Sequence, residues 1–177
     1  MSYHGLRVAG DASDEERRVW AVLEQVMDPE IPILSIVDLG VVRYAQCEPH
    51  GEGPAAVRVG LTPTYSGCPA TEVIRQSVDR ALRRQGYTDV VLDEVLAPAW
   101  TSDWLSESAH QKLRAFGIAP PDRTVDRVRH LFKPAAVACP RCSSTRTERI
   151  SEFGSTPCKA HYRCQACLEP FDQFKCI

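Results

Sequence analysis

The chain has 177 residues, of which 44% are apolar, and its formal net charge is −2. This composition excludes a disordered chain and is typical of a globular protein with a buried core. Such a balance of charge offers no basic surface to a phosphate backbone, so we expect no nucleic-acid partner. The sequence has neither a secretory signal nor an apolar run of about 18 residues, which predicts a cytoplasmic protein without a membrane partner.

A first helix is predicted over residues 13–27. Ser13 and Glu16 have the spacing of a capping box, and apolar residues then recur at helical intervals. The segment DPEIP follows, and its prolines, Pro29 and Pro32, exclude helix there. The next residues, ILSIVDLG, predict a structured turn that leads into a strand.

Two strands are expected next, near residues 41–46 and 56–61, joined by the Gly- and Pro-containing link EPHGEGP. We predict that they pair as a hairpin. Pro69 then begins a second helix, which Gly86 ends. Four arginines of this helix are predicted to form a solvated face rather than a binding patch. They are Arg75, Arg80, Arg83 and Arg84.

The segment DVVLDEVLA predicts a third strand. A last helix, capped by Thr101 or Ser102, is expected to run to Phe116, with Gly117 just past its end. The resulting order, α-β-β-α-β-α, predicts an α+β fold in which helices cover a small three-stranded sheet. A Pro-rich stretch and a change of composition follow.

The predicted organisation is a domain over residues 1–119, a linker over 120–134 and a cysteine-rich segment over 135–177. Six of the eight cysteines lie in the last 39 residues, and that segment is too short to hold a conventional hydrophobic core. Disulfides are disfavoured because the chain lacks a secretory signal and four of the cysteines form two CxxC pairs. We therefore predict a small β ribbon held together by a metal ion.

The two CxxC pairs, CPRC and CQAC, are separated by 21 residues, close to the spacing of four-thiolate zinc sites. Each pair can present two thiolates about 2.3 Å from one ion, and the free energy of metal binding then replaces the missing core. We predict a structural zinc; iron is the alternative, because rubredoxin-type and cluster sites also use four cysteines. The predicted ligands are Cys139, Cys142, Cys164 and Cys167.

Three further residues of the ribbon bear on this site. Cys158 and Cys176 are surplus to the ligand set, and burial as a small apolar residue is favoured for both over a role as alternative ligand or reactive thiol. His161 lies three residues before Cys164. For this histidine a surface or stacking role is favoured over metal ligation.

Cys68 stands apart from the ribbon, in the stretch LTPTYSGCPA. We predict that it lies at the start of the second helix, where the helix dipole and free N–H groups lower the pKa of a thiol and favour a nucleophile or a metal ligand. A buried small apolar residue fits the pattern equally well. The hydroxyls of Thr62, Thr64 and Ser66 suit either hydrogen bonds to a sulfur or closure of the turn.

The order of MDPEIPILSIVDLG and LTPTYSGCPA resembles the iron–sulfur assembly domain of SufT-type proteins and their eukaryotic cytosolic counterparts, over about residues 15–117. In that domain a DPE-x-P segment, a D/E-LG turn and a T-x-T…CP loop meet around one cysteine. The tail FGSTPCKAHYRCQACLEPFDQFKCI, together with APAWTSDWLSE, extends the resemblance to the whole chain. The full sequence resembles the PaaD family, accessory proteins of phenylacetate catabolism associated with the multicomponent phenylacetyl-CoA epoxidase.

This resemblance implies a maturation role, in which the chain helps to install an iron–sulfur or iron centre in the epoxidase system. The epoxidase components, above all the iron–sulfur reductase, are the implied partners. One cysteine does not complete the four-thiolate environment of a cluster, so holding one requires a homodimer, a partner or an external thiol. Transient transfer suits this incompleteness. The residues implied in transfer are Asp28, Glu30, Asp38, Thr62, Thr64 and Cys68.

Two other functions stay open from the sequence. The first is a thiol-dependent hydrolase or transferase that uses Cys68, although no histidine stands in a recognisable relation to this thiol. The second is an electron carrier with iron in the ribbon. Because a non-catalytic accessory role is favoured over both, no residue is assigned as catalytic.

Overall fold

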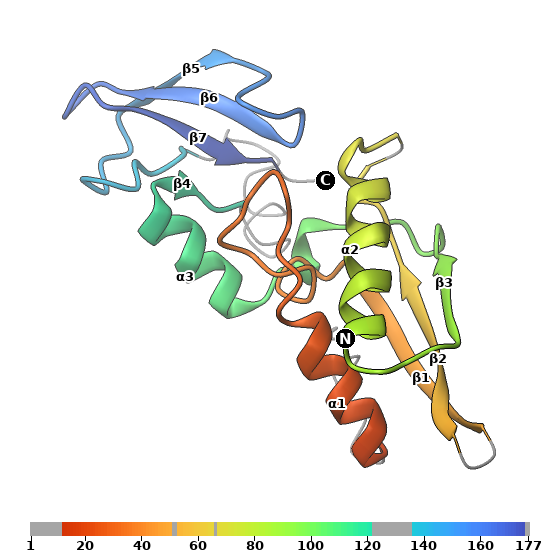
Figure 1. Ribbon diagram of the computed structural model, residues 1–177. Coiled ribbons are helices and arrows are strands. Elements are labelled where there is room, and N and C mark those ends of the chain that lie inside the picture. Colours follow the sequence, from red (N-terminus) through yellow and green to blue (C-terminus); the bar gives the residue numbers. More distant parts are fainter. Residues whose placement is uncertain (1–11, 51–52, 66, 122–135, 176–177) are drawn as a thin grey trace. The chain divides into compact units, whose positions relative to one another are not determined.

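The computed structural model (Figure 1) contains two compact units, residues 1–100 and residues 101–177. The division falls after Trp100, whereas the first domain was predicted to end at residue 119, so the segment 101–119 groups with the C-terminal unit. The structure describes residues 12–50, 53–65, 67–121 and 136–175.

The N-terminal unit confirms the predicted α+β class. Its three-stranded sheet has the order β1-β2-β3, with β1 antiparallel to β2 as the predicted hairpin requires, and β3 parallel to β2. The two helices contact each other, and α1 also contacts β1 while α2 contacts β3 (Figure 1). The elements are α1 (Asp14–Leu23), β1 (Val42–His50), β2 (Gly53–Leu61), α2 (Ala70–Arg84) and β3 (Val90–Glu94).

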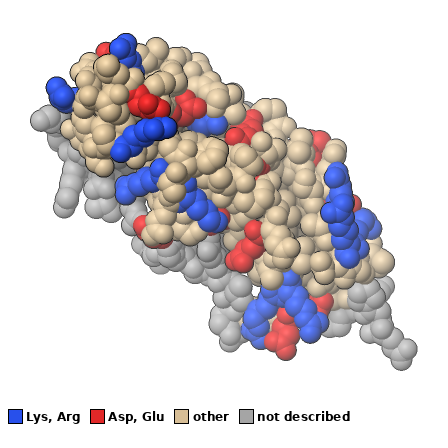
Figure 2. All heavy atoms as spheres, turned by 60° about the vertical axis from the view of Figure 1, so that its left-hand side comes forward, with Lys and Arg blue, Asp and Glu red and all other residues tan. Residues whose placement is uncertain are grey.

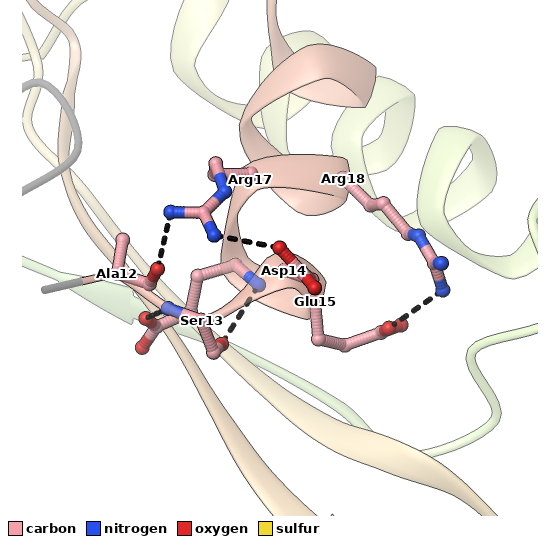
Figure 3. Close-up of polar contacts among 7 residues, drawn as sticks. Ala12, Ser13, Asp14, Glu15, Arg17 and Arg18 are labelled. Atoms are coloured by element: carbon pink, nitrogen blue, oxygen red, sulfur yellow. Dashed lines mark hydrogen bonds and ion pairs between the residues drawn. The ribbon is translucent and has the colours of Figure 1, made fainter.

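The capping box predicted for α1 is present (Figure 3). The N–H of Glu16 donates to Ser13 Oγ over 3.1 Å, and the N–H of Ser13 donates to the Glu16 carboxylate over 2.9 Å. The helix ends at Leu23, four residues before the predicted end. After Leu23 the backbone N–H groups of Gln25 and Val26 donate to the carbonyls three residues earlier, which replaces the α-helical pattern. The chain then reverses direction, and Met27 pairs with Ser35 in an antiparallel bridge.

Helix α2 follows its prediction closely. Pro69 is the N-cap rather than the first helical residue, and Gly86, with a φ of 96°, lies just past the helix end. A buried stripe of Ile74, Val78 and Leu82 anchors the helix to the core. These residues are spaced by four, which places them on one face.

The helix predicted from Thr101 or Ser102 to Phe116 is wrong in its first part. A short 3₁₀ turn, η2 (Ser102–Trp104), comes first, and α3 (Glu107–Phe116) begins only after it. Leu105, between η2 and α3, has a ψ of 136°, which is not helical and separates the two elements. The Ser106 side chain caps α3 by accepting from the N–H of Ala109. Gly117 ends α3 in the left-handed region, as predicted.

The C-terminal unit holds a four-stranded sheet of order β4-β7-β6-β5. The ribbon strands β5, β6 and β7 pair antiparallel, and β4, which directly follows α3, pairs parallel with β7. Strand β4 was not predicted. The bounds are β4 (Ile118–Ala119), β5 (Thr147–Ser151), β6 (Lys159–Cys164) and β7 (Pro170–Phe174).

Two surface properties bear on partners. On the face drawn in Figure 2, basic and acidic side chains are interspersed, in keeping with the small net charge. None of the helices within the described ranges combines the length and apolarity that a membrane crossing would need.

Candidate metal centre and candidate thiol site

The structure brings the four CxxC sulfurs together in the C-terminal unit. All four Sγ atoms lie within 4.8 Å of one another. The Cys139 and Cys167 sulfurs are 3.8 Å apart, and those of Cys142 and Cys164 are 3.6 Å apart. A tetrahedral ion with metal–sulfur bonds of about 2.3 Å requires sulfur–sulfur distances of about 3.8 Å. Two sulfur pairs match this distance, and the whole group, which lies within 4.8 Å, needs at most small side-chain shifts to surround a four-coordinate metal, so the four sulfurs can hold a metal ion.

The two CxxC turns repeat the same backbone geometry. In each, the N–H of the first cysteine donates to the carbonyl oxygen five residues later, that of Ser144 over 3.0 Å and that of Glu169 over 2.9 Å. The residue after the second cysteine is left-handed in both turns, so each turn reverses the chain and points two sulfurs the same way. These residues are Ser143 (φ 59°) and Leu168 (φ 64°).

Backbone N–H groups prepare one sulfur for metal binding. Cys164 is fully buried, and its Sγ accepts from the N–H of Cys167 over 3.5 Å and of Ala166 over 3.4 Å. These bonds, the Cys167 N–H first, lower the pKa of Cys164 to about 6. The N–H of Glu169 lowers the pKa of Cys167, but desolvation and the neighbouring sulfurs raise it to about 12. A metal ion binds cysteine as the thiolate, so metal binding at this group releases thiol protons.

The surplus residues lie outside this sulfur group. Cys158 is buried, as predicted, with its Sγ 3.0 Å from the Thr156 hydroxyl. Cys176 lies outside the described residues. His161 places Nδ1 3.0 Å from the Asp172 carboxylate.

Asp172 also accepts from Ser155 Oγ over 2.9 Å. Burial raises the pKa of Asp172, but the hydrogen bonds from His161 and Ser155 outweigh it and leave this pKa below its ordinary value. A Cβ on Gly154 would come within 2.8 Å of the Asp172 carboxylate, so the loop approaches β7 too closely for a larger residue. No sequence pattern indicated this cluster.

The candidate thiol site lies in the N-terminal unit. Cys68 is half-buried, two residues before the first residue of α2, so it lies at the predicted position. Its N–H donates to the Tyr65 carbonyl, and its own carbonyl accepts from Thr71, both over 3.2 Å. Gly67, with a φ of 79°, makes the sharp turn just before it.

The two threonines of this loop differ in exposure. Thr62 is 2% exposed and Thr64 is half-buried. The N–H of Thr62 donates to the Val41 carbonyl over 2.9 Å, and the N–H of Val41 donates to the Ile36 carbonyl over 3.0 Å. This chain of bonds joins the loop that carries Cys68 to the loop of residues 28–40, and both lie at the end of the sheet where α2 begins (Figure 1).

The carboxylates predicted beside the thiol have local roles in the 28–40 loop. Asp28 is buried, and its Oδ1 accepts from the N–H groups of Glu30 and Ile31, each over 2.8 Å. Asp38 is buried too; its Oδ2 accepts from the Ser35 N–H over 3.3 Å, and its own N–H donates to Ser35 Oγ over 3.0 Å. Both aspartates therefore close turns, a role that the sequence analysis missed.

Comparison with known proteins matches each unit to a described domain. Residues 16–91 match the family described as iron-sulfur cluster assembly protein, and residues 123–175 match the PaaD zinc beta ribbon domain. A crystal structure of a domain of unknown function, DUF59, from Bacillus anthracis is similar to the chain, with 27% identity and a TM-score of 0.51. The match covers 56% of this chain and 91% of that one. The chain thus joins an assembly-type α+β domain to a metal ribbon.

The similarity to one curated protein spans both units. An Escherichia coli K12 protein, described as one subunit of a "Putative 1,2-phenylacetyl-CoA epoxidase", is 48% identical over 171 residues, covering 97% of this chain and 99% of that one. At that identity over nearly the full length of both, the chain belongs to the PaaD family.

Proposed function

We propose that this chain is an accessory protein of a phenylacetyl-CoA epoxidase system that delivers iron or an iron–sulfur cluster to an epoxidase component through Cys68. The observation that carries the proposal is the place of this thiol: half-buried at the start of α2, inside the span matched to iron-sulfur cluster assembly proteins. The family relative described as an epoxidase subunit supports the pathway.

In this proposal the iron is cargo. Cys68 supplies one thiolate, and the remaining ligands come from a second protomer, the client or an external thiol, so the cargo is held incompletely and leaves readily. Thr64, which is half-buried in the same loop, places its hydroxyl beside the bound cargo, whereas Thr62, which is 2% exposed, acts through the bond from its N–H to Val41. Asp28 and Asp38 act indirectly, because their hydrogen bonds shape the loop that is fastened to the one carrying the thiol.

The ribbon is proposed to hold zinc as a structural ion. Four thiolates leave no open position on a tetrahedral metal, which suits a structural site rather than exchange of cargo. The described apolar cluster beside the sulfurs is small, consisting of Ala119 and Phe171 with Val137 and Tyr162 packed against it. We propose that the ribbon docks the client, with the iron–sulfur reductase component as the first candidate.

Reconstitution with metals tests whether Cys68 delivers iron while the ribbon holds a structural zinc. The zinc-loaded chain would be incubated anaerobically with ferrous iron, sulfide and a small thiol, desalted, and mixed with apo-reductase. We expect iron to transfer from the wild type and not from Cys68→Ser, while zinc content stays the same in both. Cys47→Ser is the matched control, because Cys47 is also half-buried in the N-terminal unit but burial, then Glu16 and Glu15, raise its pKa to about 11. Equal transfer by Cys68→Ser and wild type would refute the proposal.

A further inference from the structure

A groove runs along one side of α2, where the helix faces the edge strand β3. Its volume is about 720 Å³. The helix contributes most of its lining, and β3 contributes an apolar floor of Val90 and Leu92. The helical residues are Glu72, Arg75, Gln76, Asp79, Arg80, Arg83 and Arg84.

Two of the four arginines are already engaged. Arg83 pairs with Asp79 over 2.8 Å and donates to the Thr88 carbonyl over 3.0 Å. Arg75 donates to the Leu92 carbonyl over 2.9 Å. This last bond occupies an acceptor on the outer edge of β3, and so disfavours addition of a further strand there.

Arg80 and Arg84 are different. Both side chains are exposed, and neither has a hydrogen-bond or ion-pair partner in the part of the chain that the structure describes. They are four residues apart, so both guanidinium groups project from the same side of α2. A guanidinium presents its donors in a fixed fork that matches a carboxylate or phosphate in a bidentate way.

The charge pattern of the groove selects among anions. Four arginines against two acidic side chains leave an excess of two positive charges, in a chain whose net charge is −2. From Glu72 to Arg84 the helix extends about 18 Å, much longer than a single phosphate or carboxylate. Glu72, before the first arginine, and Asp79, between Arg75 and Arg80, place carboxylates along the groove and disfavour a continuous phosphate backbone. A polypeptide can instead place carboxylates at the arginines and neutral side chains elsewhere.

We propose that this groove binds an acidic segment of a protein partner, whose carboxylates pair with Arg80 and Arg84 while its apolar side chains contact Val90 and Leu92. The proposal does not depend on the role of Cys68. It replaces the solvated helix face that the sequence predicts for these two arginines with a docking role.

Fluorescence anisotropy with a labelled peptide of alternating Glu and Val residues tests the groove. We expect wild-type chain to bind this peptide, with affinity that falls as salt rises, and Arg80→Glu/Arg84→Glu to weaken binding by at least about tenfold. The matched control is Arg146→Glu/Arg163→Glu, which makes the same charge change at two exposed ribbon arginines whose side chains have no partner among the described residues. It should bind within about twofold of wild type, since general electrostatics are screened at this range.

Any result other than the two expected above contradicts the proposal. Failure of the wild type to bind the peptide, or an equal loss in the control variant, would overturn it. Tighter binding of single-stranded DNA than of peptide, lost with Arg80 and Arg84, would replace the acidic segment by a nucleic acid. Circular dichroism of each variant establishes that it is folded. Cys68→Ser should bind the peptide as the wild type does, so failure of cargo transfer and failure of docking are distinguishable.

Discussion

The N–H of Thr62 donates to the carbonyl of Val41 over 2.9 Å, and this bond fastens the Cys68 loop to the segment that ends the 28–40 loop. The position of the thiol therefore depends on the conformation of a loop that is distant in sequence. That loop is shaped by buried aspartates whose oxygens accept from its own backbone.

Asp28 provides a test of whether these carboxylates act through the fold or on the cargo. Asp28→Asn keeps an oxygen that can accept from Glu30 and Ile31, so we expect near wild-type stability and cargo transfer. Asp28→Ala leaves the buried N–H of Ile31 and the half-buried N–H of Glu30 without their acceptor and should lower the free energy of unfolding by about 1–3 kcal/mol. Urea unfolding and iron transfer to apo-reductase measure the two effects. Loss of transfer in a stable Asp28→Asn variant would instead make Asp28 a ligand of the cargo.

Removal of the metal should unfold the ribbon and leave the N-terminal sheet intact. Because few buried apolar side chains lie beside the sulfurs among the residues that the structure describes, we expect folding of the ribbon to depend on metal binding. We expect one zinc per chain by elemental analysis, and loss of amide protection in β5, β6 and β7 after treatment with a chelator or in Cys164→Ser. Protection that persists in those strands without metal would contradict a structural role for the ion.

Leu168 should be replaceable by glycine with a gain in stability. Its φ of 64° costs an L-residue other than glycine about 1 kcal/mol, and its side chain is 63% exposed, so little packing is lost on truncation. Leu168→Gly should therefore raise the stability of the zinc-loaded ribbon by up to about 1 kcal/mol. Leu168→Ala is the control, since it removes the side chain without relieving the backbone, and it should show no gain. Thermal unfolding of the loaded protein compares the two.

Asp93 should make the N-terminal unit sensitive to acid. The Tyr44 hydroxyl donates to Asp93 over 2.6 Å and Arg58 pairs with it over 2.9 Å; these contacts, Tyr44 first, hold the pKa of Asp93 below its ordinary value. A lowered carboxylate pKa stabilises the fold above the unfolded pKa of about 3.9, and the contribution is lost as pH falls through the folded value.

Between pH 5 and pH 3 the wild type should accordingly lose more stability than Asp93→Asn, and the difference should be small because solvent screens contacts at a partly exposed site. Urea unfolding followed by NMR signals of β1 to β3 measures this difference without interference from metal loss in the ribbon. Asp79→Asn, which removes an exposed carboxylate paired with Arg83, is the control. Identical pH dependence in wild type and Asp93→Asn would show that the carboxylate makes no net contribution.

Local patterns in the sequence were enough to predict much of the N-terminal unit. The Ser13 and Glu16 spacing fixes the start of α1, and Gly86 marks the end of α2, because caps and helix stops depend on neighbouring residues. The four ribbon cysteines could be identified for the same reason, since each CxxC turn is a local unit. The structure then brings all four sulfurs together.

Two kinds of feature could not be predicted: a strand that depends on a distant partner, and the role of a residue whose type suits two local structures. Strand β4 has only two residues, Ile118 and Ala119, and becomes a strand by pairing with Asp172 and Gln173 of β7. The turn-closing role of Asp28 was missed because an aspartate before a proline suits a ligand and a turn equally well in sequence. Only the hydrogen bonds of its Oδ1 distinguish the two.

The most direct test of the central claim is the iron and acid-labile sulfide content of the epoxidase reductase purified from cells that express either wild-type chain or Cys68→Ser. We predict a fully loaded reductase with the wild type and with Cys47→Ser, and a depleted one with Cys68→Ser although that variant is folded and retains its zinc. A reductase that is equally loaded in all three strains would contradict delivery through Cys68.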